Sequence, residues 1–196
     1  MSLESEGRRV RLLDNPLAIR ALAHPVRLDL FSLVSRDGPI TSAAAARQLG
    51  ISQALASHHM RQLAKYGFVE PAEATNDRDR PWRLTDTSNF TTTHDDPHSA
   101  AAGDVLEQVM AERSLANLVA WQERRDDEWR DITGAHRSMI YLTRDELAEL
   151  TGAIEALINP LVDRRKVGDR AARPPDAVPV EVTMLISVLQ QTEGGN

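Results

Sequence analysis

Residues 40–68 constrain the fold of this chain most, because they predict two short helices separated by one glycine. Thr41 or Ser42 can cap a first helix that runs through the alanine-rich residues 43–49. Gly50 follows at the point where the end of a helix favours a left-handed residue. The first helix is therefore expected to stop at Gly50, and the chain is expected to turn there.

The second helix, from Ser52 to Lys65, is predicted to have one apolar face and one polar face. Its apolar face is a narrow stripe at helical spacing that consists of Ala56, Met60 and Leu63. The opposite face carries hydrogen-bonding groups, cations and small residues: Gln53, Ala54, Ser57, His58, Arg61 and Lys65. These are the groups that base edges and phosphates require. The two helices together are typical of a helix-turn-helix.

The charge of this region differs from that of the whole chain, whose net charge is -6. No acidic residue occurs between Asp37 and Glu70, whereas Arg47, Arg61 and Lys65 all lie in that interval. The first 98 residues are neutral overall, so the acidic excess belongs to the second half. A locally positive helix pair in an acidic chain favours a polyanionic partner.

A β-hairpin is predicted directly after the second helix. Gly67 ends that helix, Val69 lies in an extended segment, and residues 82–84 (WRL) read as the returning strand. The polar loop between the two strands carries Arg78 and Arg80, which can reach a phosphate backbone. This hairpin reads as a wing.

Four short motifs give the first half of the chain a recognisable order and spacing. They are ALAHPVRL at residues 21–28, LGISQ at 49–53, SHHMRQL at 57–63 and GFV at 67–69. With them, residues 15–85 resemble the winged helix-turn-helix domain of the ArsR/SmtB-type bacterial transcriptional regulators. The resemblance implies a homodimeric repressor that binds a pseudo-palindromic operator, with the 52–65 helix in the major groove and the 72–82 wing along the flanking backbone.

The residues expected to bind double-stranded DNA lie on the two helices and the wing. They are Ser42, Arg47, Ser52, Gln53, Ala54, Ser57, His58, His59, Arg61, Lys65, Arg78 and Arg80. Adjacent helical residues point in different directions, so His59 is expected to pack at the helix edge or to meet a phosphate while His58 faces the DNA. Winged helices also serve as protein-interaction modules, and an adaptor without specific DNA binding is the alternative.

The predicted fold class is mainly α with a small β component. Residues 1–85 form the winged helix-turn-helix domain, 86–98 a linker, 99–135 a dimerisation helix and 136–196 a small α+β C-terminal region. In the family the helix that precedes the helix-turn-helix also contributes to the dimer, and Leu12, Leu13 and Leu17 are candidates here. An unknown small-molecule or protein effector is expected to act at the C-terminal region.

The C-terminal region shows one helical pattern and two extended patterns. Thr143 and Glu146 form a capping box before a helix with apolar residues at helical spacing up to Leu161. Residues 138–142 read as a strand, and strict alternation of apolar residues over 178–188 predicts a second strand. We expect these two strands to pair.

Several kinds of site are excluded or disfavoured by the residues present. The chain has no cysteine, which excludes disulfides and thiolate metal sites. Metal-sensing relatives carry Asp-x-His after the wing, but residues 86–88 here are DTS, and a second match at Asp96, His98 and Glu112 lacks one ligand because Val109 stands in its place. No cofactor is expected.

An enzyme and a membrane protein are also disfavoured. No nucleophile–base constellation, phosphate-binding glycine loop or nucleotide fingerprint is visible, so an enzyme is not expected. The polar, acidic start of the chain is not a signal peptide, and no apolar run is long enough to span a bilayer. A cytoplasmic protein is therefore expected.

Overall fold

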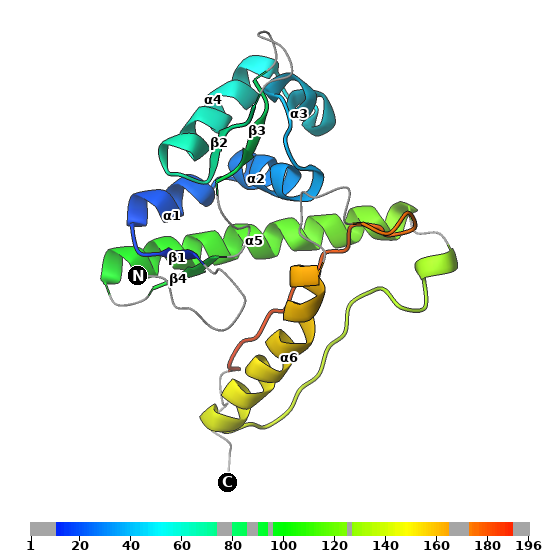
Figure 1. Cartoon of the computed structure of the whole chain (residues 1–196). Coiled ribbons are helices and arrows are strands. Elements are labelled where there is room, and N and C mark those ends of the chain that lie inside the picture. The colour runs from blue at the N-terminus through cyan, green and yellow to red at the C-terminus, as the bar shows by residue number, and fades with distance from the viewer. Residues whose placement is uncertain are drawn as a thin grey trace.

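The computed structural model describes residues 11–73, 80–85, 90–93, 96–124, 127–164 and 173–189. In the view of Figure 1, helices α1 to α4 and a β-hairpin form a packed head above the long helix α5, and α6 extends below it. The expected fold class, mainly α with a small β component around a winged helix-turn-helix, is confirmed.

Two helices precede the helix-turn-helix. Helix α1 (Pro16–Leu22) begins with proline in its first turn, and the Asn15 side chain accepts a hydrogen bond of 2.9 Å from the Leu17 amide. Helix α2 (Pro25–Asp37) begins after a break at residues 23–24, again with proline in its first turn.

The helix-turn-helix follows the capping residues that the sequence predicts. Helix α3 (Ser42–Leu49) is capped by Thr41, whose hydroxyl accepts from the Ala44 amide at 3.1 Å. Gly50 has φ 65° and ψ 29°, a left-handed conformation that costs a residue with a Cβ more than it costs glycine. Helix α4 (Gln53–Lys65) is capped by Ser52, whose hydroxyl accepts from the Leu55 amide at 3.2 Å.

The predicted wing is formed by strands β2 (Val69–Pro71) and β3 (Trp82–Leu84), which pair antiparallel with Val69 opposite Leu84. A bridge between Ile40 and Trp82 joins β3 to the segment before α3. The wing is thus fixed to both helices of the helix-turn-helix.

A second small sheet was not predicted from the sequence. Strand β1 (Arg11–Leu13) pairs parallel with β4 (Phe90–Thr92), which lies inside the predicted 86–98 linker. The Arg11 guanidinium also donates a hydrogen bond of 2.7 Å to the Tyr66 carbonyl and stacks on the Phe68 ring, 4.6 Å from its centroid. The N-terminal segment therefore braces the end of α4.

Helix α5 (Pro97–Arg124) follows this second sheet in the chain. It ends before the end of the helix predicted over 99–135, since residues 127–129 form a separate 3-10 turn and residues 130–135 are not helical. Its buried Ser99 hydroxyl donates to the Asp14 carbonyl at 2.9 Å. Leu106 is part of the same buried cluster as the head. The first turns of α5 thus belong to the core of the head.

The hydrophobic core of the described residues extends from Leu13 to Leu106. Its largest fully buried apolar side chains come from β1, α1, α2, α4, β2 and α5: Leu13, Ile19, Leu22, Leu30, Val34, Met60, Leu63, Val69 and Leu106. The apolar stripe predicted on α4 is among them. Leu13 was a candidate for the dimer interface, and that prediction is wrong for a side chain that is only 2% exposed.

The C-terminal region forms the predicted helix but not the predicted strand pair. Helix α6 (Arg144–Arg164) begins at the expected capping box, in which the Glu146 carboxylate accepts from the Thr143 amide at 2.7 Å. Residues 138–142 and 178–189 have no strand assignment, so the prediction that they pair is wrong for this chain on its own. Alternation specifies a strand only where one face can be buried, and these side chains are exposed.

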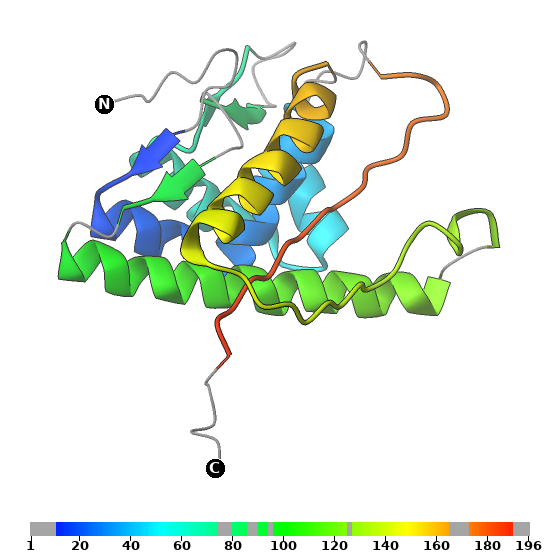
Figure 2. The ribbon, with the colours of Figure 1, turned by 90° about the horizontal axis from the view of Figure 1, so that it is seen from below.

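The segment 178–189 crosses α5 instead (Figure 2), and residues 181–187 lie against this helix. The Glu181 carboxylate accepts hydrogen bonds from the Ser114 hydroxyl and the Asn117 side chain, both at 2.8 Å. Among the described helices, none combines the length and the apolar character that a membrane span needs.

Candidate nucleic-acid interface

The outward face of α4 brings together most of the residues that the sequence predicts to bind DNA. Ser52, Gln53, Ala54, His58, Arg61 and Lys65 are all exposed, and Ser57 is half-buried at the edge of the same face. The opposite face buries Ala56, Met60 and Leu63 against the head. Packing of this stripe holds the polar face in one orientation relative to the rest of the domain.

Ser42, at the start of α3, has a second role that the sequence did not indicate. Its hydroxyl accepts a hydrogen bond of 3.0 Å from the indole Nε1 of Trp82 on β3. The hydroxyl hydrogen remains available as a donor, because the indole occupies only an acceptor position. Ser42 therefore joins α3 to the wing and can still donate to a phosphate.

The cations around α4 lie on different elements. Arg47 is exposed in the last turn of α3, and Arg80 is exposed just before β3. Arg78 lies outside the described residues. Arg83, which was not predicted to bind, forms an ion pair with Glu70 across the wing and balances the acidic residue nearest to α4.

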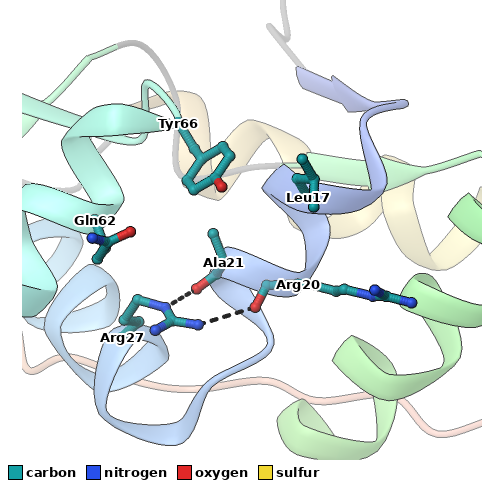
Figure 3. Close-up of a pocket in the computed structure, with 6 residues that line it drawn as sticks. All are labelled: Leu17, Arg20, Ala21, Arg27, Gln62 and Tyr66. Carbon is teal, nitrogen blue, oxygen red and sulfur yellow. Dashed lines mark hydrogen bonds between the residues drawn. The ribbon is translucent and has the colours of Figure 1, made fainter.

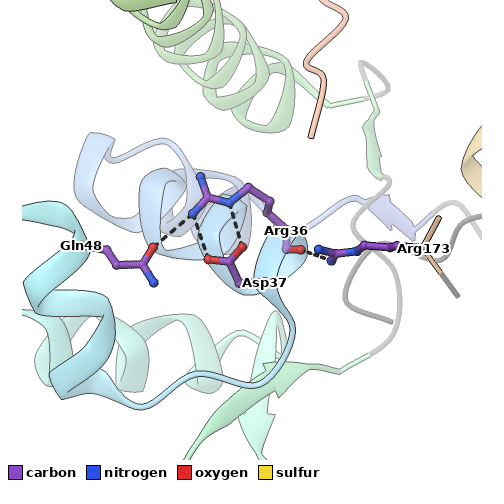
Figure 4. Close-up of polar contacts among 4 residues, drawn as sticks. All are labelled: Arg36, Asp37, Gln48 and Arg173. Carbon is purple, nitrogen blue, oxygen red and sulfur yellow. Dashed lines mark hydrogen bonds and ion pairs between the residues drawn. The ribbon is translucent and has the colours of Figure 1, made fainter. Parts of the chain in front are cut away.

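The other acidic residue that borders this region, Asp37, is also paired. Arg36 makes a two-point contact with the Asp37 carboxylate, with both distances 2.9 Å, and donates to the Gln48 side chain at 3.1 Å (Figure 4). Hydrogen bonding with Asp37 raises the pKa of Arg36. The Arg173 guanidinium donates to the Arg36 carbonyl (Figure 4), so the C-terminal segment reaches the end of α2.

His59 does not belong to the outward face. It is 6% exposed, and its ring packs against His24, with 4.7 Å between ring centroids. A side chain enclosed between α2 and α4 cannot reach a phosphate while the head is folded. We therefore remove His59 from the candidate interface, whereas the other described residues stay predictions.

The described residues contain no group of three or more possible metal ligands close enough to hold an ion. Asp96 instead caps α5, accepting from the amides of His98 at 3.0 Å and Ser99 at 2.8 Å. Hydrogen bonding with Ser99 lowers the pKa of this carboxyl. The DTS segment at residues 86–88 and His94 lie outside the described residues.

Part of the head matches a known protein family in sequence. Residues 22–72 match the family model described as a helix-turn-helix domain. No protein of curated function matches the chain in sequence.

Solved structures of low similarity were also found. Reduced HlyU from Vibrio cholerae is 17% identical, with 50% of this chain and 84% of that chain covered and a TM-score of 0.33. A transcriptional regulator from Thermotoga maritima is 14% identical over 73% and 89%, with a TM-score of 0.32. The multiple antibiotic-resistance repressor MarR of Listeria monocytogenes is 13% identical over 74% and 83%, with a TM-score of 0.29. Likeness at this level does not extend to function.

Proposed function

We propose that this protein is a sequence-specific, DNA-binding transcriptional regulator that acts as a dimeric repressor of the ArsR type. Helix α4 enters the major groove of a pseudo-palindromic operator, and the 72–82 wing follows the flanking phosphates. Gln53, Ser57, His58 and Arg61 read base edges, while Arg47, Lys65 and Arg80 contact phosphates.

One observation carries this proposal: α4 presents an exposed cationic and hydrogen-bonding face on a helix-turn-helix domain, in a stretch of sequence with no acidic residue. The two acidic residues at its borders, Asp37 and Glu70, are each paired with an arginine. The local field above α4 is therefore positive although the whole chain is acidic. Few cations contribute, so the salt dependence of binding is expected to be moderate.

Dimerisation through α5 is the second part of the proposal. Beyond Leu106 the described side chains of α5 are not buried, and Leu115 and Val119 are among its exposed apolar residues. On α1, Leu17 is 56% exposed. Apolar side chains at such positions favour burial against another surface, and a two-fold dimer supplies the symmetry that a pseudo-palindrome requires.

Selection of DNA fragments from the source genome tests the proposal directly. The full chain is expected to retain a small set of fragments that share an inverted repeat, and retention is expected to weaken as salt increases. A winged-helix adaptor would retain no specific duplex at any salt concentration, and that result would favour the alternative function.

The variant Arg61→Ala tests the reading helix on the selected duplex. Loss of one good base contact costs about 1–3 kcal/mol, so affinity is expected to fall on the order of 10- to 100-fold. Arg144→Ala is the matched control, because Arg144 is an exposed arginine at the start of α6, outside the head. Equal affinity of the two variants would remove Arg61 from the interface.

A further inference from the structure

A cluster of histidines lies directly behind the proposed reading face, at the contact between α2 and α4. The His24 ring, at the N-terminal cap of α2, packs on the His59 ring of α4 with 4.7 Å between centroids and an interplanar angle of 42°. The His58 ring meets His59 edge-on, with 5.3 Å between centroids. The three rings thus connect the start of α2 to the exposed face of α4.

The two inner rings lack full hydrogen bonding, and His59 is buried while His24 is half-buried. Within the described part of the chain, the Nδ1 atoms of both His24 and His59 are enclosed and have no hydrogen-bond partner. A buried polar atom without a partner costs free energy, and a buried charge without a partner costs considerably more. The contact therefore fits neutral imidazoles. If either ring were protonated at Nδ1, the new N–H would have no hydrogen-bond acceptor at its present position.

The charges that face this pair are positive. Arg27 of α2 acts on both rings, and His58 of α4 acts on His59. The other side of Arg27 borders a cavity of about 180 Å³ that Tyr66 also lines. Arg27 is held in place, since its guanidinium donates to the carbonyls of Ala21 and Arg20 (Figure 3). Its charge cannot easily move away from a protonated ring.

Burial, and then the charge of Arg27, lower the pKa of His24. Burial also lowers the pKa of His59, with further contributions from His24, Arg27 and His58. The position of His24 at the N-terminal end of α2 acts in the same direction, because the positive end of the helix dipole disfavours a cation.

We propose that the His24–His59 contact is an acid-sensitive joint in the DNA-binding head. Protonation of either ring places a cation beside Arg27. Among the residues that the structure describes, no carboxylate acts on either ring, so the contact between α2 and α4 opens. Because this contact orients α4, acidification disables the reading helix. The loss of DNA binding rests on the proposed function, whereas the opening of the head does not.

The direction of the pH effect follows from the lowered pKa values. The unfolded chain binds protons at the ordinary histidine value of 6.5, while the folded head resists them to a lower pH. The stabilising contribution of the neutral pair is complete above pH 6.5 and is lost as the pH falls from there through the folded pKa.

The stability experiment compares the melting midpoint of the full chain at pH 7.5 and pH 5.5. The double variant His24→Phe/His59→Phe keeps two packed rings but cannot titrate. His136→Gln, which replaces an exposed histidine far from the head, is the control. From pH 7.5 to pH 5.5 the melting midpoint of each protein is expected to fall. The fall is expected to be larger by about 4 °C or more for the parent and the control than for the double variant.

A single variant keeps the test decisive if the double variant does not fold. Asn is a good capping residue, so His24→Asn is expected to fold and to remove part of the acid sensitivity. Hydrogen exchange at pH 5.5 is expected to show lower protection of the α4 amides in the parent than in His24→Asn. An identical pH dependence of the parent and the folded variants would overturn the proposal.

The DNA experiment separates this joint from the proposed function. The parent is expected to retain less of the selected genomic duplex at pH 5.5 than at pH 7.5. The double variant His24→Phe/His59→Phe is expected to retain the same amount at both pH values. If the parent retains no duplex at either pH, the proposed function is wrong. The melting comparison still tests whether the His24–His59 contact is sensitive to acid. If binding by both proteins falls equally, acidification does not act through His24 and His59.

Discussion

The ion pair between Asp29 and Arg113 ties the head to α5, and its removal should have a pH-dependent cost. Asp29 lies on α2 and Arg113 on α5, with 2.5 Å between Oδ1 and Nε. The Asp29 side chain is 16% exposed and that of Arg113 is 42% exposed. Arg113→Met removes the charge and keeps most of the apolar stem, so it isolates the electrostatic part of the contact.

The magnitude follows from the unequal exposure of the two partners. Breaking a fully buried pair costs about 3–5 kcal/mol, and an exposed pair contributes about 0–1 kcal/mol. Solvent reaches Arg113 but largely not Asp29, so the expected loss for Arg113→Met is about 1–2 kcal/mol at pH 7. The double variant Asp29→Asn/Arg113→Met leaves no buried charge, and it should recover part of that loss.

The sign of the pH dependence is fixed by Asp29. Burial raises the pKa of this carboxyl above its ordinary value of 3.8, and Arg113 opposes the rise. In Arg113→Met the folded pKa rises further. A carboxyl with a raised folded pKa is destabilising once it ionises, so the penalty is small below pH 3.8 and grows as the pH rises through the folded pKa.

Urea denaturation of the parent and the two variants at pH 4 and pH 7 measures these differences, provided that the m-values agree. The reasoning is refuted if Arg113→Met is destabilised more at pH 4 than at pH 7. It is equally refuted if the double variant is less stable than Arg113→Met at pH 7.

Two further predictions concern the turn and the extent of the folded head. Gly50→Ala should cost about 1–2 kcal/mol in urea denaturation, because Gly50 has φ 65° with open space around it and the cost is purely conformational. Gly152→Ala, equally open but inside α6, should not lower stability, and equal losses in the two variants would contradict the conformational explanation. A chain that ends at residue 124 should keep one cooperative calorimetric transition, because the buried apolar residues of the described chain lie between 13 and 106. Loss of that transition would show that the C-terminal region supports the head.

Local signals in the sequence predicted the helix-turn-helix well because its determinants are local. Thr41, Gly50 and Ser52 act within four residues of their own positions. Helix α3 begins and ends, and α4 begins, as these residues specify. The parallel pairing of β1 with β4 depends on residues about eighty positions apart, and neither strand has a pattern of its own. Strands this short cannot be predicted from local sequence, because they form only when the packed head brings them together.

The candidate site was predicted less completely than the fold. Helical spacing separated the buried Met60 from the exposed Arg61. His59 was included for its polar side chain, although its spacing from Ala56 and Leu63 places it on the buried face. The ALAHPVRL motif contained His24, yet only packing could show that His24 meets His59. The prediction of strands at 138–142 and 178–188 was wrong for another reason. Alternation shows that a segment can bury one face, but it does not show that a surface is present to cover that face.

The start of α5 also constrains how the proposed dimer could meet DNA. Near the start of the helix, Gly103 lies so close to Thr92 that an added Cβ would come within 3.3 Å of its hydroxyl oxygen, and Ser99 is hydrogen-bonded to the Asp14 carbonyl. Because α5 packs this closely against the head, the angle between the axis of α5 and the head is fixed. In a dimer paired along α5, the separation of the two α4 helices would then be a property of that angle. Such a dimer would bind operators whose half-sites are about 34–36 Å apart, one turn of the duplex, or a multiple of that distance. It could not bind a different spacing by bending between the head and α5.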